Sequence, residues 1–423
     1  MSPFRRSFAV AYLAAAAILV NAGARADTAV FPTGRFPDDV YSVRGAVANG
    51  GIVLLKAVDA NGTGTSFNFG PAAPGSGTVT LLADVTLVGE TIEGRKTTIS
   101  GGNIPLRINT AQSAIRGIHL QGPRALGILV LASKDVEITG NTITDVVPQV
   151  ISGFRFARGI LVGSSAVQGA LLISHNIIAG VHGDGSYGIA VSNHTADTRI
   201  SGNVVTDVDL VGILVGGNTS PVSIDSNVVT PGPGTFPDSL GNGIEFGHTR
   251  GGPAYIANNT VICENPNADG ILIVGLGTVQ RPENDAVIEK NDITMRGSLY
   301  GGISLLDQAS NNLVRANKIS GYGAYALQVA TFVPPGIAEG NSFIGNNISH
   351  FVAAVAEVFL DINSQGTIVK GNSGTAIDLG TGDAIGGSAS KALDVNVGSR
   401  LRQAQALKRR ILQAVPEDDL AVQ

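Results

Sequence analysis

The sequence predicts an all-β protein in which short parallel strands stack as successive coils of a solenoid, with a helix at each end. Three observations predict it: a Gly-Ile strand motif recurs along the chain, an I-x-x-N-x-[IV] motif alternates with it, and their spacing is irregular. Repeats of this kind indicate units that bury their apolar side chains against their neighbours. A composition of 43% apolar and 5% aromatic residues suits a core of closely spaced aliphatic layers.

Residues 1–26 have the pattern of a cleavable signal peptide. Two arginines precede an apolar run over residues 8–20, and Ala24-Arg25-Ala26 fits an A-x-A cleavage site. The run is too short to span a membrane, and no later stretch reaches about 18 uncharged apolar residues. We therefore expect a secreted or periplasmic protein, cleaved near Ala26, without a membrane span.

The mature chain is expected to begin with a short amphipathic helix at about residues 38–49, which Gly50 and Gly51 stop. We expect this helix to cap the N-terminal end of the core, because the first coil of a stack would otherwise be open to water. A long loop rich in Gly, Pro, Thr and Ser follows over residues 59–79. Strands are expected at 52–57 before the loop and, in the first coils, at 84–89, 97–101 and 115–120.

The repeated coils are expected to fill a solenoid domain over residues 27–385. The asparagines of successive motifs are 24 to 35 residues apart, which indicates stacked coils with loop insertions of variable length. The Gly-Ile strands begin at Gly127, Gly159, Gly188, Gly212, Gly243, Gly270 and Gly302, with weaker copies at Ala326 and Val358. The asparagines are Asn141, Asn176, Asn203, Asn227, Asn259, Asn291, Asn317, Asn346 and Asn372.

Each of these asparagines is predicted to lie at a sharp corner, because Asn tolerates the left-handed backbone conformation better than other non-glycine residues. Stacked Asn side chains can also form hydrogen bonds along the solenoid axis. The apolar residues three positions before and two positions after each Asn are predicted to point inward and to stack on their counterparts. Parallel crossovers are right-handed, so the solenoid should be right-handed as well.

From Gly386 the repeat fades, and residues 386–423 are predicted to form a linker and an amphipathic helix. Leu401, Leu407 and Ile411 fall on one face of a helix over residues 399–415. We expect this helix to cap the solenoid or to lie along it. Docking of a basic helix on an acidic partner is the alternative.

The Gly-Ile and asparagine motifs resemble those of the pectin-lyase-like superfamily of right-handed parallel β-helix proteins, with repeats of the NosD/PbH1 type, over roughly residues 40–385. This superfamily includes polysaccharide lyases, glycoside hydrolases, pectin esterases, uronan epimerases, and non-catalytic adhesins and maturation factors. The catalytic signatures of its pectate lyases and alginate epimerases are absent from this sequence. Of the polygalacturonase signatures, only G-H-G has a similar segment, at residues 247–250. The resemblance therefore implies the fold and matches no specific enzyme family.

The charge, histidine spacing and cysteine content argue against a nucleic-acid partner, a metal site and a disulfide-stabilised fold. A net charge of −5 and a pI of about 5.7 argue against a nucleic-acid partner. The six histidines show no H-x-H or H-x-x-E spacing, so neither a metal nor another cofactor is predicted. With a single cysteine, Cys263, the chain must draw its stability from the core and not from a disulfide.

Because coils stack in register, residues at one offset from each glycine should form a column on the surface. The residue before each glycine is often a tyrosine or a polar residue, and such groups stack on sugar rings and bind sugar hydroxyls. The alternative is that they are turn residues flanking glycine. The predicted substrate-binding residues, which include two from the following turns, are Tyr187, His194, Asn242, Arg250, Asp269, Tyr300 and Tyr325.

Candidate catalytic residues come from two further columns. Glu245 is the lone carboxylate in an outward, mostly apolar column, where burial between Leu214 and Leu272 would raise its pKa as in a general acid. A solvated or salt-bridged glutamate is the alternative. His248 and Asp307 lie in the turn after the strand, two coils or about 10 Å apart. The apolar column itself is expected to be covered by loops or by the C-terminal helix, or to bind a partner.

We hypothesise that the exported protein binds an extracellular or periplasmic polysaccharide along its long face, and cleaves or epimerises it as a lyase, hydrolase or epimerase. The rival hypothesis is a non-catalytic surface or matrix protein whose solenoid is structural or adhesive. An enzyme should gather at least two groups with strongly shifted pKa in one groove. The sequence leaves open the polysaccharide, a calcium requirement, the oligomeric state and the export route.

Overall fold

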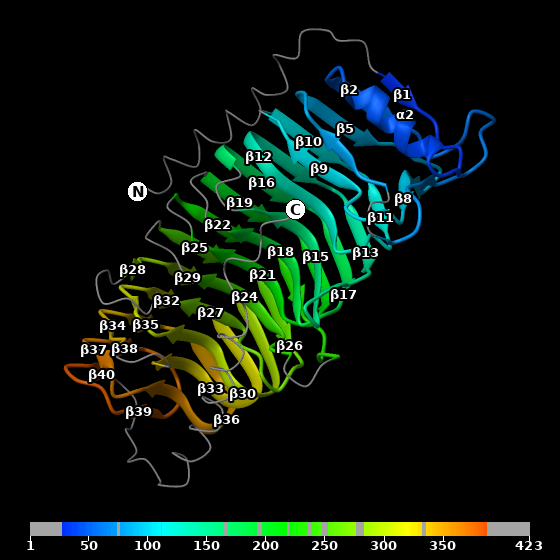
Figure 1. Cartoon of the computed structure of the whole chain (residues 1–423). Coiled ribbons are helices and arrows are strands. Elements are labelled where there is room, and N and C mark those ends of the chain that lie inside the picture. Colours follow the sequence, from blue (N-terminus) through cyan, green and yellow to red (C-terminus); the bar gives the residue numbers. More distant parts are fainter. Residues whose placement is uncertain are drawn as a thin grey trace.

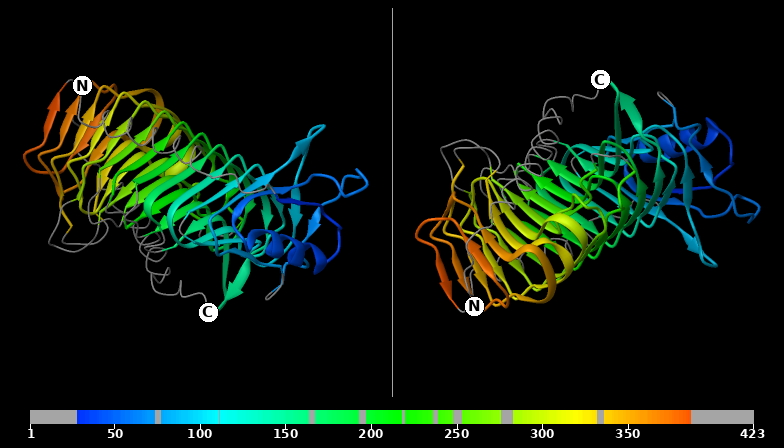
Figure 2. Two further views of the ribbon diagram at one scale, coloured as in Figure 1. Left: turned by 90° about the horizontal axis from the view of Figure 1, so that it is seen from above. Right: turned by 90° about the horizontal axis from the view of Figure 1, so that it is seen from below.

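The structure is a computed structural model that describes residues 28–73, 77–110, 112–163, 167–192, 197–217, 220–235, 239–247, 253–275, 283–331 and 336–386. The predicted signal peptide and the predicted helix over 399–415 lie outside these residues. In the described part, parallel strands form the coils of an elongated solenoid (Figures 1 and 2). Helix α2 (Asp38–Val47) and strand β1 (Thr28–Val30) lie at one end, and strands β39 (Ala376–Asp378) and β40 (Ala384–Gly386) lie at the other (Figure 1).

The coils place their strands in three parallel stacks, and long strands bend from one stack into the next. The first stack holds the Gly-Ile strands: β4 (Val79–Leu81), β9 (Leu106–Asn109), β12 (Leu126–Thr139), β15 (Phe154–Val162), β18 (Gly185–Ser192), β21 (Val211–Gly216), β24 (Asn242–Gly247), β27 (Ile271–Val274), β30 (Asp292–Leu306), β33 (Lys318–Ala330), β36 (Asn347–Leu360) and β39 (Ala376–Asp378).

The second stack holds the strands that precede the asparagines: β1 (Thr28–Val30), β2 (Gly51–Leu55), β5 (Val85–Gly89), β10 (Gln112–Arg116), the end of β12, β16 (Val167–Ser174), β19 (Asp197–Ser201), β22 (Val222–Asp225), β25 (Ala254–Ala257), β29 (Val287–Glu289), β32 (Leu313–Arg315), β35 (Ser342–Ile344), β38 (Ile368–Lys370) and β40 (Ala384–Gly386).

The third stack holds the strands that follow the asparagines: β3 (Phe67–Asn68), β8 (Thr98–Ser100), β11 (His119–Gln121), β13 (Thr142–Val146), β17 (Ile177–Val181), β20 (Val204–Val208), β23 (Val228–Thr230), β26 (Thr260–Cys263), and the first halves of β30, β33 and β36. Short strands decorate the coils: β6 (Thr91–Ile92), β7 (Arg95–Lys96), β14 (Gln149–Ile151), β28 (Glu283–Asn284), β31 (Ala309–Ser310), β34 (Ala338–Glu339) and β37 (Ser364–Gln365).

The predicted inward rows are confirmed. In the second stack, Ile138 pairs with Ile173, which pairs with Ile200, and the row continues coil by coil to Val369. In the third stack, Ile143 pairs with Ile178 in the same way. All of these side chains are fully or almost fully buried in one continuous core. The first coils form near the expected positions, but the strand expected over 115–120 is divided between β10 and β11 by a corner at Gly117, where φ is +68°. The loop predicted over 59–79 contains β3 and the start of β4.

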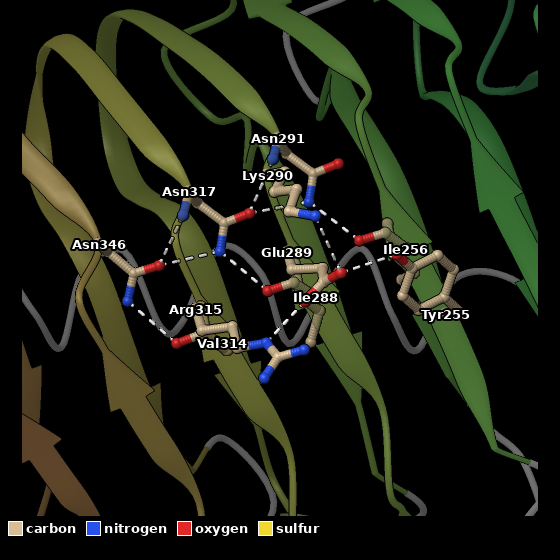
Figure 3. Close-up of polar contacts among 10 residues, drawn as sticks. All are labelled: Tyr255, Ile256, Ile288, Glu289, Lys290, Asn291, Val314, Arg315, Asn317 and Asn346. Carbon is tan, nitrogen blue, oxygen red and sulfur yellow. Dashed lines mark hydrogen bonds and ion pairs between the residues drawn. The ribbon is translucent and has the colours of Figure 1, made fainter. Parts of the chain in front are cut away.

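The asparagines form a buried ladder along the axis (Figure 3). The backbone N–H and the Nδ2 of Asn291 both donate to Oδ1 of Asn317, at 3.0 and 2.9 Å, and Asn291 Nδ2 also donates to the Ile256 carbonyl at 3.0 Å. The same pattern joins successive coils from Asn141 to Asn372. Each ladder asparagine therefore ties the corner of its coil to the next coil.

The prediction that these asparagines adopt the left-handed conformation is wrong. The residue before each of them has the positive φ, for example +56° at Lys290 and +53° at Ala316, while the asparagines do not. The reason is that Asn must point its side chain into the core to join the ladder. The preceding residue then has to turn the corner, and it is glycine at some coils, such as Gly202.

Ala316→Gly should raise the free energy of unfolding by about 1 kcal/mol, because alanine at φ +53° carries a steric cost that glycine lacks. Denaturant unfolding would measure the difference. The matched control is Ala132→Gly, an exposed position in β12 without a positive φ, where glycine should lower stability by about 0.5–1 kcal/mol. Destabilisation by both substitutions would contradict this account of the corner.

Glycine is required where the chain enters the strands of the first stack, because the next coil packs too closely there for a side chain. A Cβ atom on Gly270 would lie 2.4 Å from the Gly302 carbonyl oxygen and 2.6 Å from Cγ2 of Ile293. Gly243 would meet the Gly270 oxygen at 2.5 Å, and Gly159 would meet the Gly188 oxygen at 2.6 Å. The column of glycines thus lets neighbouring coils approach where the chain enters the first stack.

At the N-terminal end, α2 spans Asp38–Val47. Its side chains Val40, Val43 and Val47 are buried and belong to the same core as the coils. The buried Asp39 carboxylate fixes the preceding loop by accepting hydrogen bonds from Thr33 N at 2.7 Å and from Asn68 N at 2.7 Å. That this helix protects the first coil as a cap stays a prediction.

Candidate functional site

The predicted column of residues before the glycines is aligned in the structure. Arg158 pairs with Tyr187, Tyr187 with Val211, and Val211 with Asn242. At the far end, Tyr325 pairs with Gly301, so Tyr300 stands one position ahead of the column. The sequence offsets therefore do bring these residues onto the outer side of the first stack.

Arg158 and Tyr187 form the first polar contact of this column. The guanidinium carbon lies 5.3 Å from the centroid of the Tyr187 ring, within the range of a cation–π interaction. Burial lowers the pKa of Arg158 and raises the pKa of Tyr187 to about 12, with Arg158 opposing the second shift and Glu245 adding to it. The Nε atom of Arg158 is enclosed and has no hydrogen-bond partner.

Asn242 connects the buried Glu245 carboxylate to the backbone of Asp269 on the next coil. Its Nδ2 donates to Oε2 of Glu245 at 3.0 Å, and its Oδ1 accepts the backbone N–H of Asp269 at 2.9 Å. The Asp269 carboxylate accepts the Ser304 hydroxyl at 2.5 Å and the Gly301 N–H at 3.2 Å. Asn242, Glu245, Asp269 and Ser304 thus form one network across three coils.

The tyrosines of the column are held in their protonated form. Burial raises the pKa of Tyr300, and the nearby Asp269 raises it further. Burial also raises the pKa of Tyr325, whose ring stacks on Phe359 with centroids 5.0 Å apart. At neutral pH these phenols can donate a hydrogen bond but do not act as general bases.

The outward column that contains Glu245 is buried except for the half-buried Leu214, although it points away from the core. The exposed fractions of Leu161, Ala190 and Leu272 are 3%, 2% and 0%, and Glu245 is 6% exposed. Leu161, Ala190 and Leu272 belong to smaller apolar clusters separate from the main core. In the same column Gln328 is 2% exposed, and its Oε1 has no hydrogen-bond partner.

The three predicted catalytic residues do not form one described constellation. Glu245 pairs with Leu272, which pairs with Ser304, and Asp307 lies three residues further in a turn with φ +58°. Asp307 lies near Asp361, whose pKa is raised mainly by burial and also by Asp307. His248, and the predicted binding residues His194 and Arg250, lie outside the described residues.

One polar cluster on the second stack was missed in the sequence. Glu289 accepts the Tyr255 hydroxyl at 2.7 Å and Nε of Arg315 at 2.6 Å (Figure 3). Burial works to raise the pKa of Glu289, but the bonds from Tyr255 and Arg315 outweigh it and lower that pKa. Fixed offsets from the ladder asparagines could have found the cluster, since its members lie two or four residues before Asn259, Asn291 and Asn317.

A second missed cluster surrounds His182, after β17. Its Nδ1 lies 3.2 Å from Asp209 and its Nε2 lies 3.3 Å from Asp207. The buried Asp209 carboxylate also accepts the Thr235 hydroxyl at 2.6 Å and the Gly183 N–H at 3.0 Å. These bonds tie three neighbouring turns together, which is a structural role.

Two open hollows lie near the N-terminal end. One of about 380 Å³ is lined by residues that include Asn68 and Ser100, and a neighbouring one of about 270 Å³ is lined by Arg95 and Lys96. Both share Thr65 as a lining residue. They lie apart from the column of Tyr187 and Glu245.

Two further properties concern the described residues alone. Within them, no group of three or more His, Cys, Asp or Glu side chains is arranged to hold a metal ion. No helix among them has the length and apolar character that a membrane crossing requires.

Residues 83–229 match the protein-family profile described as "Right handed beta helix region". No curated protein matches the chain significantly in sequence. Among solved structures, the chain is similar to the Dettilon tailspike protein (gp208), with 17% sequence identity and a TM-score of 0.55. The alignment covers 82% of this chain and 67% of the tailspike chain.

Two more solved structures are similar at lower scores. The A-module of the mannuronan C-5 epimerase AlgE4 from Azotobacter vinelandii has 15% identity and a TM-score of 0.43, covering 89% of this chain and 97% of the module. DFA-IIIase from Arthrobacter chlorophenolicus A6 has 13% identity and a TM-score of 0.40, covering 90% and 87%. Such low identities concern the fold and not the activity. By its parallel coils, its family match and its likeness to the tailspike, the chain is a right-handed parallel β-helix protein.

Proposed function

We propose that this protein binds a polysaccharide along the outer side of its first stack. The observation that carries the proposal is the column from Arg158 to Tyr325, in which ring, amide and carboxylate groups follow one another on neighbouring coils. Sugar rings stack on aromatic faces, and sugar hydroxyls both donate and accept hydrogen bonds.

Two polar atoms of this face favour a hydroxyl-bearing ligand. Nε of Arg158 is a buried donor without an acceptor, and Oε1 of Gln328 is a buried acceptor without a donor. A buried polar atom without a partner costs about 1–3 kcal/mol. A sugar hydroxyl that reached either atom would satisfy it, and the two atoms lie in neighbouring columns of the first stack.

Binding is favoured over cleavage by the state of the described groups. The phenols of Tyr187, Tyr300 and Tyr325 have raised pKa values and stay protonated at neutral pH, so they lack the basicity that proton abstraction needs. Glu245 is engaged by Asn242, and no hydrogen bond among the described residues joins it to Asp307. A non-catalytic carbohydrate-binding protein is therefore the function we propose.

Export is part of the proposal. Residues 1–26 have the charged start, apolar run and small-residue cleavage site of a signal peptide. A protein carried across the membrane by such a signal would meet polysaccharides of the periplasm or the cell exterior. Amino-terminal sequencing of the protein from the extracytoplasmic fraction should identify Asp27 as the first residue.

The binding test is gel retardation and calorimetry of the purified protein with a panel of uronate and neutral polysaccharides. We expect at least one to bind without release of unsaturated products or reducing ends. Tyr187→Phe and Tyr325→Phe, which keep the ring and remove the hydroxyl, should each weaken that binding roughly three- to tenfold.

The matched control is Tyr322→Phe, because Tyr322 lies on β33 like Tyr325 but is 57% exposed and outside the column. This variant should bind as the unaltered chain does. If no polysaccharide of the panel binds, the proposal fails and the structural or adhesive role is left. If products are released and Glu245→Gln abolishes their release, the protein is an enzyme.

A further inference from the structure

Two adjoining hollows lie on the outer side of the third stack, beside strand β8 at the N-terminal end (Figure 1). Both are lined by Thr65 and Ser66. The larger, of about 380 Å³, also includes Asn68, and we call it the hydroxyl hollow. The smaller, of about 270 Å³, includes Arg95 and Lys96, and we call it the basic hollow. A neutral polar surface therefore adjoins a positively charged one.

The walls carry polar side chains because the strands that form them alternate. Phe67 of β3 and Ile99 of β8 pair with each other and are fully buried. The residues on either side of them point outward and are half-buried: Ser66, Asn68, Thr98 and Ser100. Hydroxyl and amide groups in this arrangement suit the hydroxyls of a saccharide, which both donate and accept hydrogen bonds.

The positive charge of the basic hollow is not neutralised within the described part of the chain. No described Asp or Glu lines either hollow, and neither Arg95 nor Lys96 takes part in an ion pair there. Glu90, whose carboxylate accepts the N–H of the lining residue Ala57 at 3.1 Å, is itself paired with Lys56 at 2.5 Å. An oxyanion would therefore meet two cations that have no carboxylate partner.

Lys96 also extends toward the following coils. Its Nζ donates to the Thr142 hydroxyl at 3.2 Å, and a neutral hydroxyl leaves the ammonium charge uncompensated. Burial lowers the pKa of His119, and the charge of Lys96 lowers it further. His119 is therefore neutral at pH 7, so the charge beside the basic hollow comes from Arg95 and Lys96.

A glycine gives the Arg95 side chain its place. A Cβ atom on Gly64 would lie 1.8 Å from Nη1 of Arg95 and 2.9 Å from its Cζ, so the guanidinium lies directly against the Gly64 backbone. The φ angle of Gly64 is not positive, so the backbone conformation does not itself require glycine there. The absence of a side chain at Gly64 therefore leaves room for the guanidinium at the basic hollow.

We propose that the two hollows together bind an acidic saccharide. The oxyanion of a uronate or a sulfated sugar lies between Arg95 and Lys96, and neutral hydroxyls of the same saccharide bind Ser66, Asn68 and Ser100. Hollows of this size hold about one or two sugar rings. The site lies apart from the first-stack column and does not rest on the proposed function.

The test is calorimetry of the full-length chain at low ionic strength with trisaccharides of galacturonate, of mannuronate and of sulfated galactose. We expect at least one to bind. Its uncharged form, the methyl ester or the desulfated sugar, should bind about tenfold or more weakly, because it lacks the oxyanion. Acetate or inorganic sulfate should also bind about tenfold or more weakly, because neither reaches the hydroxyl hollow.

Variants of the basic hollow should separate charge from position. Arg95→Gln and Lys96→Gln should each weaken binding of the acidic trisaccharide about five- to tenfold and leave its uncharged form unaffected. Gly64→Ala keeps the charge but displaces the end of the Arg95 side chain, so it should weaken binding roughly threefold or more. Its unfolding midpoint should stay unchanged, because a flexible side chain can move aside.

The matched control is Lys134→Gln, which removes one charge at an exposed position of β12 outside both hollows. This variant should bind as the unaltered chain does. Tyr187→Phe and Tyr325→Phe, which alter the first-stack column, should also leave this binding unchanged.

Several outcomes would overturn the proposal. It fails if none of the three trisaccharides binds, if the charged and uncharged forms bind equally, or if Lys134→Gln weakens binding as much as Arg95→Gln. Equal affinity for the free anions and the trisaccharides would leave a small oxyanion site and remove the saccharide. Loss of binding in Tyr187→Phe alone would place the ligand on the first-stack column. If a trisaccharide binds as expected here and no polysaccharide of the panel binds to the column, this site stands and the proposed function fails.

Discussion

Asn259→Ala is expected to lower the free energy of unfolding by about 3–5 kcal/mol. The Asn259 side chain accepts the N–H and the Nδ2 of Asn227, both at 2.9 Å, and donates to the Ile224 carbonyl at 2.9 Å and to Asn291 at 2.9 Å. Alanine would leave the Asn227 N–H and the Ile224 carbonyl without partners inside the core. Each buried group without a partner costs about 1–3 kcal/mol, and water cannot reach these sites.

Denaturant unfolding followed by circular dichroism would measure this loss. The matched control is Asn347→Ala, because Asn347 is exposed and its side chain bonds only locally, to Ser349. That substitution should change stability by less than about 0.5 kcal/mol. Equal effects at Asn259 and Asn347 would mean that the ladder adds nothing beyond ordinary surface contacts.

Gly270→Ala is expected to be comparably harmful, at about 2–4 kcal/mol. Its Cβ would stand 2.4 Å from the Gly302 oxygen, and that oxygen belongs to the backbone of the next coil and cannot turn aside. The coils would have to separate locally, which would stretch the strand pairing of β27 with β30.

The control for this substitution is Gly45→Ala in α2, where a Cβ meets nothing within 4 Å. Alanine is the better helix former, so this change should raise stability by about 0.5–1 kcal/mol. Thermal melts of the two variants should shift in opposite directions. A harmless Gly270→Ala would show that the coils can yield at this contact.

The parts of the fold that could be predicted from the sequence are those in which one residue type repeats at one place. Rows such as Ile138, Ile173 and Ile200 are visible because each coil uses the same shape to fill the same space. The left-handed corner was assigned to the wrong residue, because it is occupied by different types at successive coils, including His175, Ser226 and glycine. The corner residues share a backbone conformation but no residue type, so no sequence motif marks them.

The sequence predicted which residues of the candidate site align on neighbouring coils, but not which groups surround and bond to them. Counting from the glycines correctly placed Tyr187 and Asn242 in one column. Cover over the column of Glu245 was expected from its apolar neighbours, but the residues that bury Glu245 and the bond that it accepts from Asn242 were not visible in the repeat. The Glu289 cluster was missed because Tyr255 and Arg315 are unlike in chemistry and meet only through the carboxylate between them.

Because of the asparagine ladder, the number of residues in a coil does not affect the rise from one coil to the next. Its bonds join each coil to the next whether 24 residues lie between the two asparagines, as from Asn203 to Asn227, or 35, as from Asn141 to Asn176. Extra chain can therefore leave and re-enter a corner without altering the pitch of the stack. A whole coil could therefore be duplicated or deleted between two ladder asparagines, and the remaining coils would still stack on one another. The loops can vary in length and sequence, and thus in what they bind, while the ladder keeps the solenoid axis unchanged.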